Sequence, residues 1–276
     1  MVQLRKTFEN NDKISFRGAA AAKFGASVSW THEALATKTS IRHHKKQTIP
    51  DRTDQQRALA KIKCGRLLRK FPNVAFILDD ESYFTISHSS VNGNGGFYTS
   101  NISETPVDVK FARKKKFEGK VLVWIALCPA GLSQPLIRKS GYAINASRYL
   151  DEWIRRRLIP YIRQNYPDDN YVFWPDQASA HYAKVVIDHL RSENVRFVKK
   201  NDNPANVPEV RPIEDFWAYL KSLVYAKCWR ASNTDQLITR IKYCLKKVDQ
   251  LIVQKLAKST KKRIDAVRRF GVAESR

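Results

Sequence analysis

The chain has 276 residues, and its 50 lysines and arginines outnumber its 26 aspartates and glutamates, which gives a formal net charge of +24. A hydrophobic content of 43% can fill a core and excludes a wholly disordered chain. The sequence contains no apolar run of about 18 residues, which excludes a membrane span, and its N-terminus lacks the apolar stretch of a signal peptide. Its four cysteines have no C-x-x-C spacing, which argues against a zinc ribbon or a disulfide scaffold and favours a reducing intracellular setting.

The excess positive charge lies at the two ends of the chain. The net charge is +11 over residues 1–70, +2 over residues 71–220 and +11 over residues 221–276. A surplus of this size points to a polyanionic partner, either nucleic acid or an acidic membrane surface. The distribution favours a central catalytic or structural core whose flanks bind the polyanion.

Two short helices are predicted near the N-terminus. Residues 17–25 predict an alanine-rich helix, and residues 29–38 predict a second helix with Ser29 as its N-cap. Two short helices joined by a glycine-containing turn are typical of a helix-turn-helix, whose second helix enters the major groove of DNA. Any helical hairpin gives a similar pattern, so this signal is weak by itself.

A basic linker and a longer helix follow. The linker extends from residue 41 to residue 51 and includes Lys45 and Lys46. The next segment, residues 53–70, predicts an amphipathic helix. Its apolar positions include Ala58, Ile62 and Leu67.

The rest of the chain alternates between apolar runs and amphipathic segments. Strands are predicted at residues 74–78, 83–87, 121–128, 171–174 and 195–198, and the second of these could pair with the first. Helices are predicted at residues 147–163 and 180–191, from Pro212 to about residue 225, and once or twice within residues 234–257. Mixed strands followed by strand–helix alternation predict an α/β core.

Acidic residues stand at the ends of predicted strands. Asp79 and Asp80 close the first strand, and Asp176 follows the strand at residues 171–174. Glu214 lies in the first turn of a helix, where the helix dipole alone already favours an acid. Functional groups gather at the carboxyl ends of strands in α/β sheets, and carboxylate oxygens are the ligands that Mg²⁺ prefers. These acids therefore predict a divalent-cation site, with surface or capping acids as the alternative.

Three segments of the chain resemble the signature blocks of the Tc/mariner superfamily of DDE transposases. They are FILDDESYF at 76–84, WPDQASAH at 174–181 and VPEVRPIEDFWAYLK at 207–221. The family's blocks are a strand followed by Asp-Glu, an Asp followed by small residues that end in Ala-His, and Pro-x-x-x-Pro-x-Glu followed by Trp and Leu-Lys. Between Asp176 and Glu214 lie 37 residues, close to the spacing usual in the family. The resemblance covers about residues 53–257.

The resemblance implies an RNase H-like fold, with a mixed sheet flanked by helices and a helix-turn-helix segment before it. It implies a cut-and-paste DNA transposase that uses two Mg²⁺ or Mn²⁺ ions to cut DNA at transposon inverted repeats and to join the ends to target DNA at TA. The implied catalytic and metal-binding residues are Asp80, Asp176 and Glu214. Asp80 is preferred to Asp79 because it directly precedes Glu81, and Asp215 is the fallback for Glu214.

The implied partners are double-stranded DNA, as transposon ends and target, and a second copy of the chain in a homodimer, with no membrane. The nucleus is the expected location. Phosphate contacts are expected from basic residues, which position DNA without reading its sequence. The candidates are Lys45, Lys46, Arg113, Lys114, Lys115 and Lys116. The run at 113–116 could instead be a nuclear import signal or a solvated loop.

Three domains are expected. They are a helix-turn-helix remnant with its basic linker at residues 1–52, the catalytic domain at residues 53–257 and a basic C-terminal tail at residues 258–276. Family members carry two helix-turn-helix modules, whereas this sequence has room for one, so an N-terminal truncation is expected. The alternatives to an active transposase are a catalytically silent or domesticated DNA-binding derivative and, less favoured, a ribonuclease of the same fold.

Overall fold

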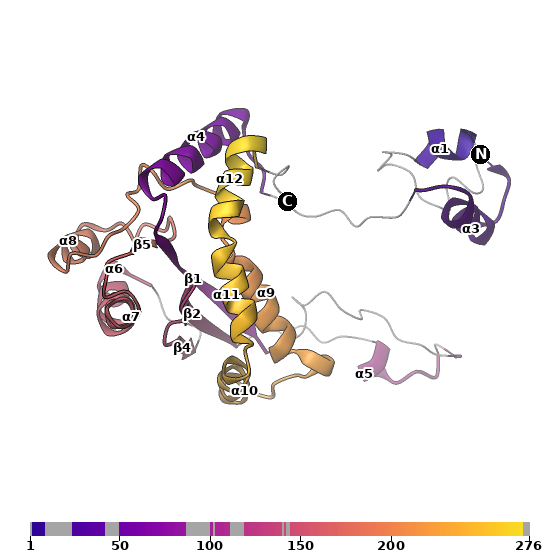
Figure 1. The fold of residues 1–276 in the computed structure, drawn as a ribbon. Coiled ribbons are helices and arrows are strands. Elements are labelled where there is room, and N and C mark those ends of the chain that lie inside the picture. The colour runs from indigo at the N-terminus through magenta and orange to yellow at the C-terminus, as the bar shows by residue number, and fades with distance from the viewer. Residues whose placement is uncertain are drawn as a thin grey trace. The chain divides into compact units, whose positions relative to one another are not determined.

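A computed structural model describes residues 2–8, 24–41, 50–86, 100–101, 103–110, 119–139, 141 and 144–272 (Figure 1). The chain divides into two compact units, Met1–Ile49 and Pro50–Arg276. Within the described residues, the helices are all too short or too polar to cross a membrane.

The first unit contains helices α1 (Val2–Phe8) and α3 (Val28–Lys38). Helix α3 confirms the predicted second helix, but its N-cap is Ser27, not Ser29. The Ser27 hydroxyl accepts a hydrogen bond from the Trp30 backbone N–H at 3.1 Å, and the extended backbone of Ser27 places Ser29 inside the helix. Most of the predicted helix at residues 17–25 and most of the basic linker lie outside the described residues.

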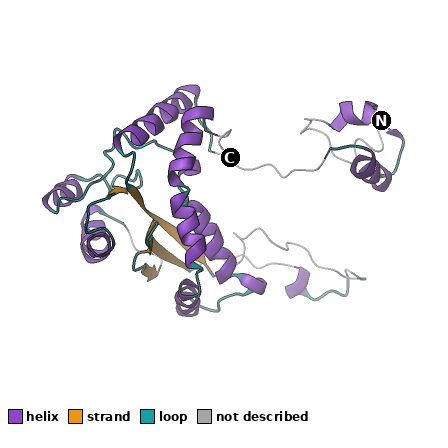
Figure 2. Cartoon of the chain, viewed as in Figure 1, coloured by secondary structure: helices purple, strands orange, loops and turns teal. Residues whose placement is uncertain are grey.

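The second unit is built on a five-stranded mixed sheet, drawn in orange in Figure 2. Its strands are β1 (Ala75–Thr85), β2 (Lys120–Cys128), β3 (Gly131–Leu132), β4 (Leu136–Lys139) and β5 (Tyr171–Trp174). The strand order is β3-β2-β1-β5, and β4 also pairs with β2. Strand β1 is antiparallel to β2 and parallel to β5, which confirms the predicted mixed sheet.

Strand β1 differs from the prediction, because the expected strands at 74–78 and 83–87 form one continuous strand that pairs with β2 instead of with each other. Asp79 and Asp80 do not end the strand. Their backbones pair with β2 opposite Ala126 and Ile125, and the Asp79 carboxylate finds hydrogen-bond donors inside the core. A buried carboxylate with donors is compatible with a strand interior.

Helices cover the sheet and confirm most of the predicted amphipathic segments. The principal ones are α4 (Asp54–Lys70), α6 (Ala146–Arg148), the π-helix η2 (Tyr149–Leu158), α7 (Ile159–Asn165), α8 (Lys184–Ser192), α9 (Ile213–Val224), α10 (Thr234–Lys246), α11 (Gln250–Lys258) and α12 (Thr260–Phe270). Shorter helical segments are α5 (Val107–Lys110) and the 3₁₀ turns η3 (Pro208–Val210) and η4 (Ala226–Cys228). The strand predicted at 195–198 is reduced to one bridge between Phe197 and Phe173.

Alternation along the strands gives the sheet two apolar faces. Leu78 and Phe84 of β1 belong to a core shared with α4 and α9–α12. Ile77 of β1 and Trp124 of β2 belong to a second core shared with η2, α7 and α8. The sheet therefore lies between two layers of helices, as Figure 1 shows, and each face of β1 meets a different layer.

Helix α4 buries a different face from the one that its apolar residues predicted. Of the expected positions, only Leu67 is buried, whereas Ile62 is 51% exposed. The buried residues are Ala60, Cys64 and Leu67, whose spacing of three and four gives one stripe along the helix. This stripe belongs to the core that α4 shares with α12.

Residues 258–276 do not form a tail over their first part, because residues 260–270 are helix α12, packed against α4. Ile264 and Val267, three residues apart among lysines and arginines, are fully buried in the core. Together with Thr260, these residues place one face of the basic helix against the core.

We expect Ile264→Ala to lower the free energy of unfolding by about 2–5 kcal/mol, because the substitution leaves a cavity between α12 and the core. Urea denaturation followed by circular dichroism measures this change. The control is Lys262→Ala on the exposed side of α12, which should change the stability by less than about 0.5 kcal/mol. Equal stability of Ile264→Ala and the wild-type protein would show that α12 does not contribute to the core.

Candidate active site

The neighbouring acids Asp79 and Asp80 point to opposite faces of the sheet, because side chains alternate along a strand. The Asp79 side chain is fully buried on the face covered by η2. Its Oδ2 accepts hydrogen bonds from the Tyr149 hydroxyl at 2.7 Å and from Trp124 Nε1 at 3.1 Å. Its Oδ1 accepts from the Asp176 backbone N–H at 3.3 Å. Hydrogen bonds from the protein thus satisfy both carboxylate oxygens of Asp79, so we interpret Asp79 as a residue that stabilises the fold.

Asp80 lies on the other face, toward α9. Its Oδ2 accepts a hydrogen bond from Trp217 Nε1 at 2.9 Å. Burial raises the pKa of Asp80 to about 7. The positive charge of Arg211 opposes this rise, and the negative charges of Glu214 and Glu81 add to it. An acid with a raised pKa beside other acids is typical of a functional site.

Asp176 lies just beyond the end of β5, on a loop that hydrogen bonds from Asn203 help to stabilise. Asn203 Nδ2 donates to the Pro175 carbonyl at 2.9 Å, and Asn203 Oδ1 accepts from Trp174 Nε1 at 2.8 Å. The Asn203 carbonyl accepts from Gln177 Nε2 at 2.6 Å. Asn203 therefore fixes the residues on both sides of Asp176, a role that the sequence did not indicate.

Glu214 lies in the first turn of α9, where its N–H donates to the Arg211 carbonyl at 3.1 Å. The residue is exposed as a whole, but protein atoms crowded around its carboxyl group raise its pKa. The charge of Arg211 opposes this rise, and that of Asp176 adds to it. Neighbouring Asp215 instead pairs with Arg263 of α12. Asp215 therefore has an ion-pair partner on α12, whereas the charge of Glu214 also acts on Asp80.

Asp80, Asp176 and Glu214 thus come from three distant segments. The charge of Glu214 acts on Asp80, and the charge of Asp176 acts on Glu214. Carboxylate oxygens suit a hard divalent cation such as Mg²⁺ or Mn²⁺, whose charge would offset their repulsion. The donor chemistry fits such an ion. Within the described part of the chain, however, three or more Asp, Glu, His or Cys side chains do not gather closely enough to form a ready-made metal site.

A buried histidine joins the Asp176 loop to β1. His181 is 1% exposed, with Nε2 at 3.2 Å from Glu81 Oε1 and Nδ1 at 3.3 Å from the Asp176 carbonyl oxygen. Burial lowers the pKa of His181, but the Glu81 hydrogen bond and the charges of Asp79, Glu81 and Asp176 outweigh burial and raise it to about 9. The imidazole is therefore protonated at neutral pH. Its sequence signal is the Ala-His that ends the second block.

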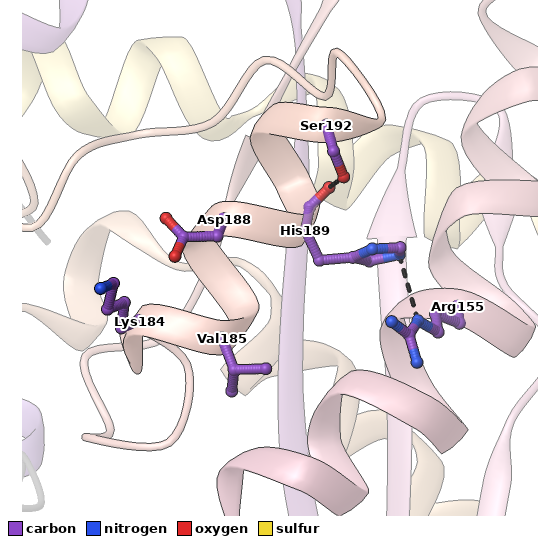
Figure 3. A pocket seen from close by; sticks show the side chains of 6 residues that line it. All are labelled: Arg155, Lys184, Val185, Asp188, His189 and Ser192. Carbon is purple, nitrogen blue, oxygen red and sulfur yellow. Dashed lines mark hydrogen bonds between the residues drawn. The ribbon is translucent and has the colours of Figure 1, made fainter.

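The predicted DNA contacts fall outside the described residues. They are Lys45, Lys46, Arg113, Lys114, Lys115 and Lys116. An open groove elsewhere in the described residues lies between η2 and α8 (Figure 3). There Arg155 Nε contacts His189 Nε2 at 3.4 Å, and none of the predicted site residues lines the groove.

No protein-family model matches the sequence. The transposable element Tcb1 transposase of Caenorhabditis briggsae is 27% identical over 150 residues, which is 54% of this chain and 51% of that protein. The transposable element Tc3 transposase of Caenorhabditis elegans is 25% identical over 153 residues, 55% of this chain and 42% of that protein. The chain spans about half the length of the curated relatives it matches.

Solved structures agree with these relatives. A Mos1 mariner paired-end complex with Mn superposes with a TM-score of 0.71 at 17% identity, over 97% of this chain and 77% of the Mos1 chain. The Mos1 catalytic domain alone superposes with a TM-score of 0.58 at 15% identity, over 80% of this chain and 96% of that domain. The chain is similar in sequence to the Tcb1 and Tc3 transposases over about half of its length. Its fold is similar to that of the Mos1 transposase, which agrees with the predicted α/β fold class.

The contrast between Asp79 and Asp80 can be measured with two matched substitutions. Asp79→Asn should lower the free energy of unfolding by about 1–3 kcal/mol, because the new amide N–H group faces a buried donor. Asp80→Asn should raise stability at pH 7 without divalent cations, because asparagine can still accept from Trp217 and carries no charge. Urea denaturation in EDTA at several pH values measures both effects.

The pH dependence follows from the raised pKa of Asp80. Between its ordinary value of 3.8 and about 7, the folded protein holds a proton that the unfolded chain has lost. Asp80 therefore makes the wild-type protein less stable as the pH rises through this interval, and Asp80→Asn removes this loss. The gain from Asp80→Asn should shrink toward pH 4. A gain that does not vary with pH, or a loss of stability, would contradict this description of Asp80.

Proposed function

We propose that this protein is a cut-and-paste DNA transposase, which cleaves DNA strands at transposon ends and transfers them to target DNA. The observation that carries the proposal is a set of three acids from β1, the β5 loop and α9 on a fold similar to that of Mos1. The charge of Glu214 acts on Asp80, and the charge of Asp176 acts on Glu214. The Tcb1 and Tc3 proteins that this sequence resembles are transposases, and the Mos1 neighbours include a paired-end complex with the left transposon end.

Asp80, Asp176 and Glu214 are proposed to hold two Mg²⁺ or Mn²⁺ ions. Mos1 catalytic domain structures contain Mg or Mn, which supports this choice of ions. Two bound ions would stabilise the attacking and leaving oxygens of a phosphodiester displacement. Lys221 of α9 lies close enough to Asp80 and Glu214 for their charges to act on it, and we propose that its ammonium group contacts a DNA phosphate beside the acids.

The proposed partners are double-stranded DNA and a second copy of this chain. The net charge of +24 suits a long polyanion, and the basic residues of the linker and of the 113–116 run are proposed to contact its phosphates. The paired-end complexes of Mos1 support a dimeric assembly on two DNA ends. The nucleus remains the proposed location.

Cleavage of DNA fragments taken from both sides of the gene, where an intact transposon would carry its inverted repeats, tests the proposal. With Mn²⁺, Asp176→Ala should reduce strand cleavage by at least about 100-fold, because one metal ligand is lost, while DNA binding in a gel-shift assay persists. The matched control is Asp188→Ala, which removes an exposed acid of α8 that pairs only loosely with Arg191. This variant should cleave like the wild-type protein.

The outcomes separate the possible functions. DNA binding by the wild-type protein without cleavage would favour the silent, DNA-binding derivative of a transposase. Equal cleavage by the wild-type protein and Asp176→Ala would show that another site cuts the DNA.

A further inference from the structure

Arg211 contacts the chain next to each of the three proposed metal ligands. This residue lies between η3 and α9, and its side chain is buried. Its Nη2 donates to the Asp79 carbonyl at 2.5 Å, and its Nη1 donates to the Pro175 carbonyl at 3.4 Å. Asp79 directly precedes Asp80, and Pro175 directly precedes Asp176. The Arg211 carbonyl accepts the Glu214 N–H at 3.1 Å, so all three acid-bearing segments meet at this residue.

The two side-chain contacts of Arg211 lie just beyond the end of the backbone pairing between β1 and β5. The parallel pairing of β1 with β5 ends at Leu78 and Trp174. The next residues are Asp79 and Pro175, and proline has no N–H with which to continue the ladder. The guanidinium of Arg211 binds the carbonyl oxygens of these same two residues. Arg211 thus replaces strand pairing immediately before Asp80 and Asp176.

The chemistry of this contact requires arginine. The planar guanidinium presents several N–H groups in a fixed fork, which can reach two carbonyl oxygens at once, whereas lysine offers a single ammonium. The Arg211 guanidinium also lies over the Trp174 ring, 5.8 Å from its centroid. Nearby Arg52 shows the more usual arrangement of a buried arginine, a paired contact with the Glu209 carboxylate at 3.1 and 2.8 Å.

We propose that Arg211 is a positioning residue that holds Asp80, Asp176 and Glu214 in the arrangement needed to bind divalent cations. The proposal rests on the function proposed above, because it takes these acids as the metal ligands. Groups behind the metal ligands orient them, and their loss weakens metal binding even though they never touch the metal.

A purely electrostatic role predicts the opposite result. The positive charge of Arg211 acts on both Asp80 and Glu214. If charge alone mattered, a neutral residue at position 211 would remove a repulsion and tighten the binding of a cation. Positioning predicts weaker binding both when the charge is kept and when it is removed.

Mn²⁺ binding to the full chain, measured by isothermal titration calorimetry, separates these roles. Arg211→Lys and Arg211→Gln should each weaken Mn²⁺ binding by about 10- to 100-fold. The matched control is Arg52→Lys, which changes a buried arginine just before α4 that pairs with Glu209 of η3 and has no hydrogen bond to Asp80, Asp176 or Glu214. It should lower the melting temperature but bind Mn²⁺ like the wild-type protein. A titration of Asp176→Ala under the same conditions shows how much of the measured heat comes from Mn²⁺ binding at this site.

Each outcome decides the proposal. Wild-type affinity in Arg211→Lys, or tighter binding in Arg211→Gln, overturns the positioning role while the proposed function stands. Equal weakening in Arg52→Lys overturns it as well, because a general loss of packing would then explain the effect. If the wild-type protein binds no Mn²⁺, the metal-dependent function fails and the role of Arg211 fails with it. Circular dichroism checks that each variant folds. If Arg211→Gln does not fold, the Mn²⁺ affinity of Arg211→Lys, the milder change, tests the proposal.

Discussion

The parallel pairing of β1 with β5 is the constraint on which the proposed site depends. Four residue pairs, from Ala75–Tyr171 to Leu78–Trp174, join segments that lie almost 100 residues apart in the chain. This short ladder brings Asp79 and Asp80 beside Asp176. Beyond this ladder, side chains connect the two segments in place of backbone hydrogen bonds. The Asp79 carboxylate accepts from the Asp176 N–H, and Arg211 donates to the carbonyl groups of Asp79 and Pro175. The site therefore begins where regular hydrogen bonding between the strands ends.

Because side chains alternate between the two faces of β1, the neighbouring residues Asp79 and Asp80 have different roles. Asp79 faces Tyr149 and Trp124 and stabilises the core, whereas Asp80 faces α9 and the acid at its start. The sequence could predict this site in outline, because an apolar strand followed by acids is a local pattern. It could rank Asp80 above Asp79 only by resemblance to a family. The physical reason for the ranking is the set of buried donors around Asp79, which come from η2, β2 and the β5 loop.

The parts of the structure that sequence reasoning missed depend on contacts between distant segments. Asp79 and Asp80 were expected to end a strand, because a carboxylate inside a strand is costly unless donors far along the chain satisfy it. The sequence predicts a basic tail where helix α12 forms, because the two buried residues Ile264 and Val267 give only a weak apolar pattern among basic residues. Asn203 and Arg211 lie in a proline-rich loop without regular periodicity, and their roles emerge only from the carbonyl groups that they meet. Helix α4, by contrast, begins at a local capping box on Thr53, and α9 follows Pro212 and has amphipathic spacing.

The central claim is that Asp80, Asp176 and Glu214 form one divalent-cation site. Crystals of the protein grown with Mn²⁺ and measured near the manganese absorption edge test it most directly, because anomalous scattering locates the metal without assumptions about its ligands. The account predicts anomalous peaks bounded by carboxylate oxygens of these three residues and absent from Asp176→Ala crystals. Peaks at Asp79 or Asp215 instead, or a site that persists in Asp176→Ala, would contradict it.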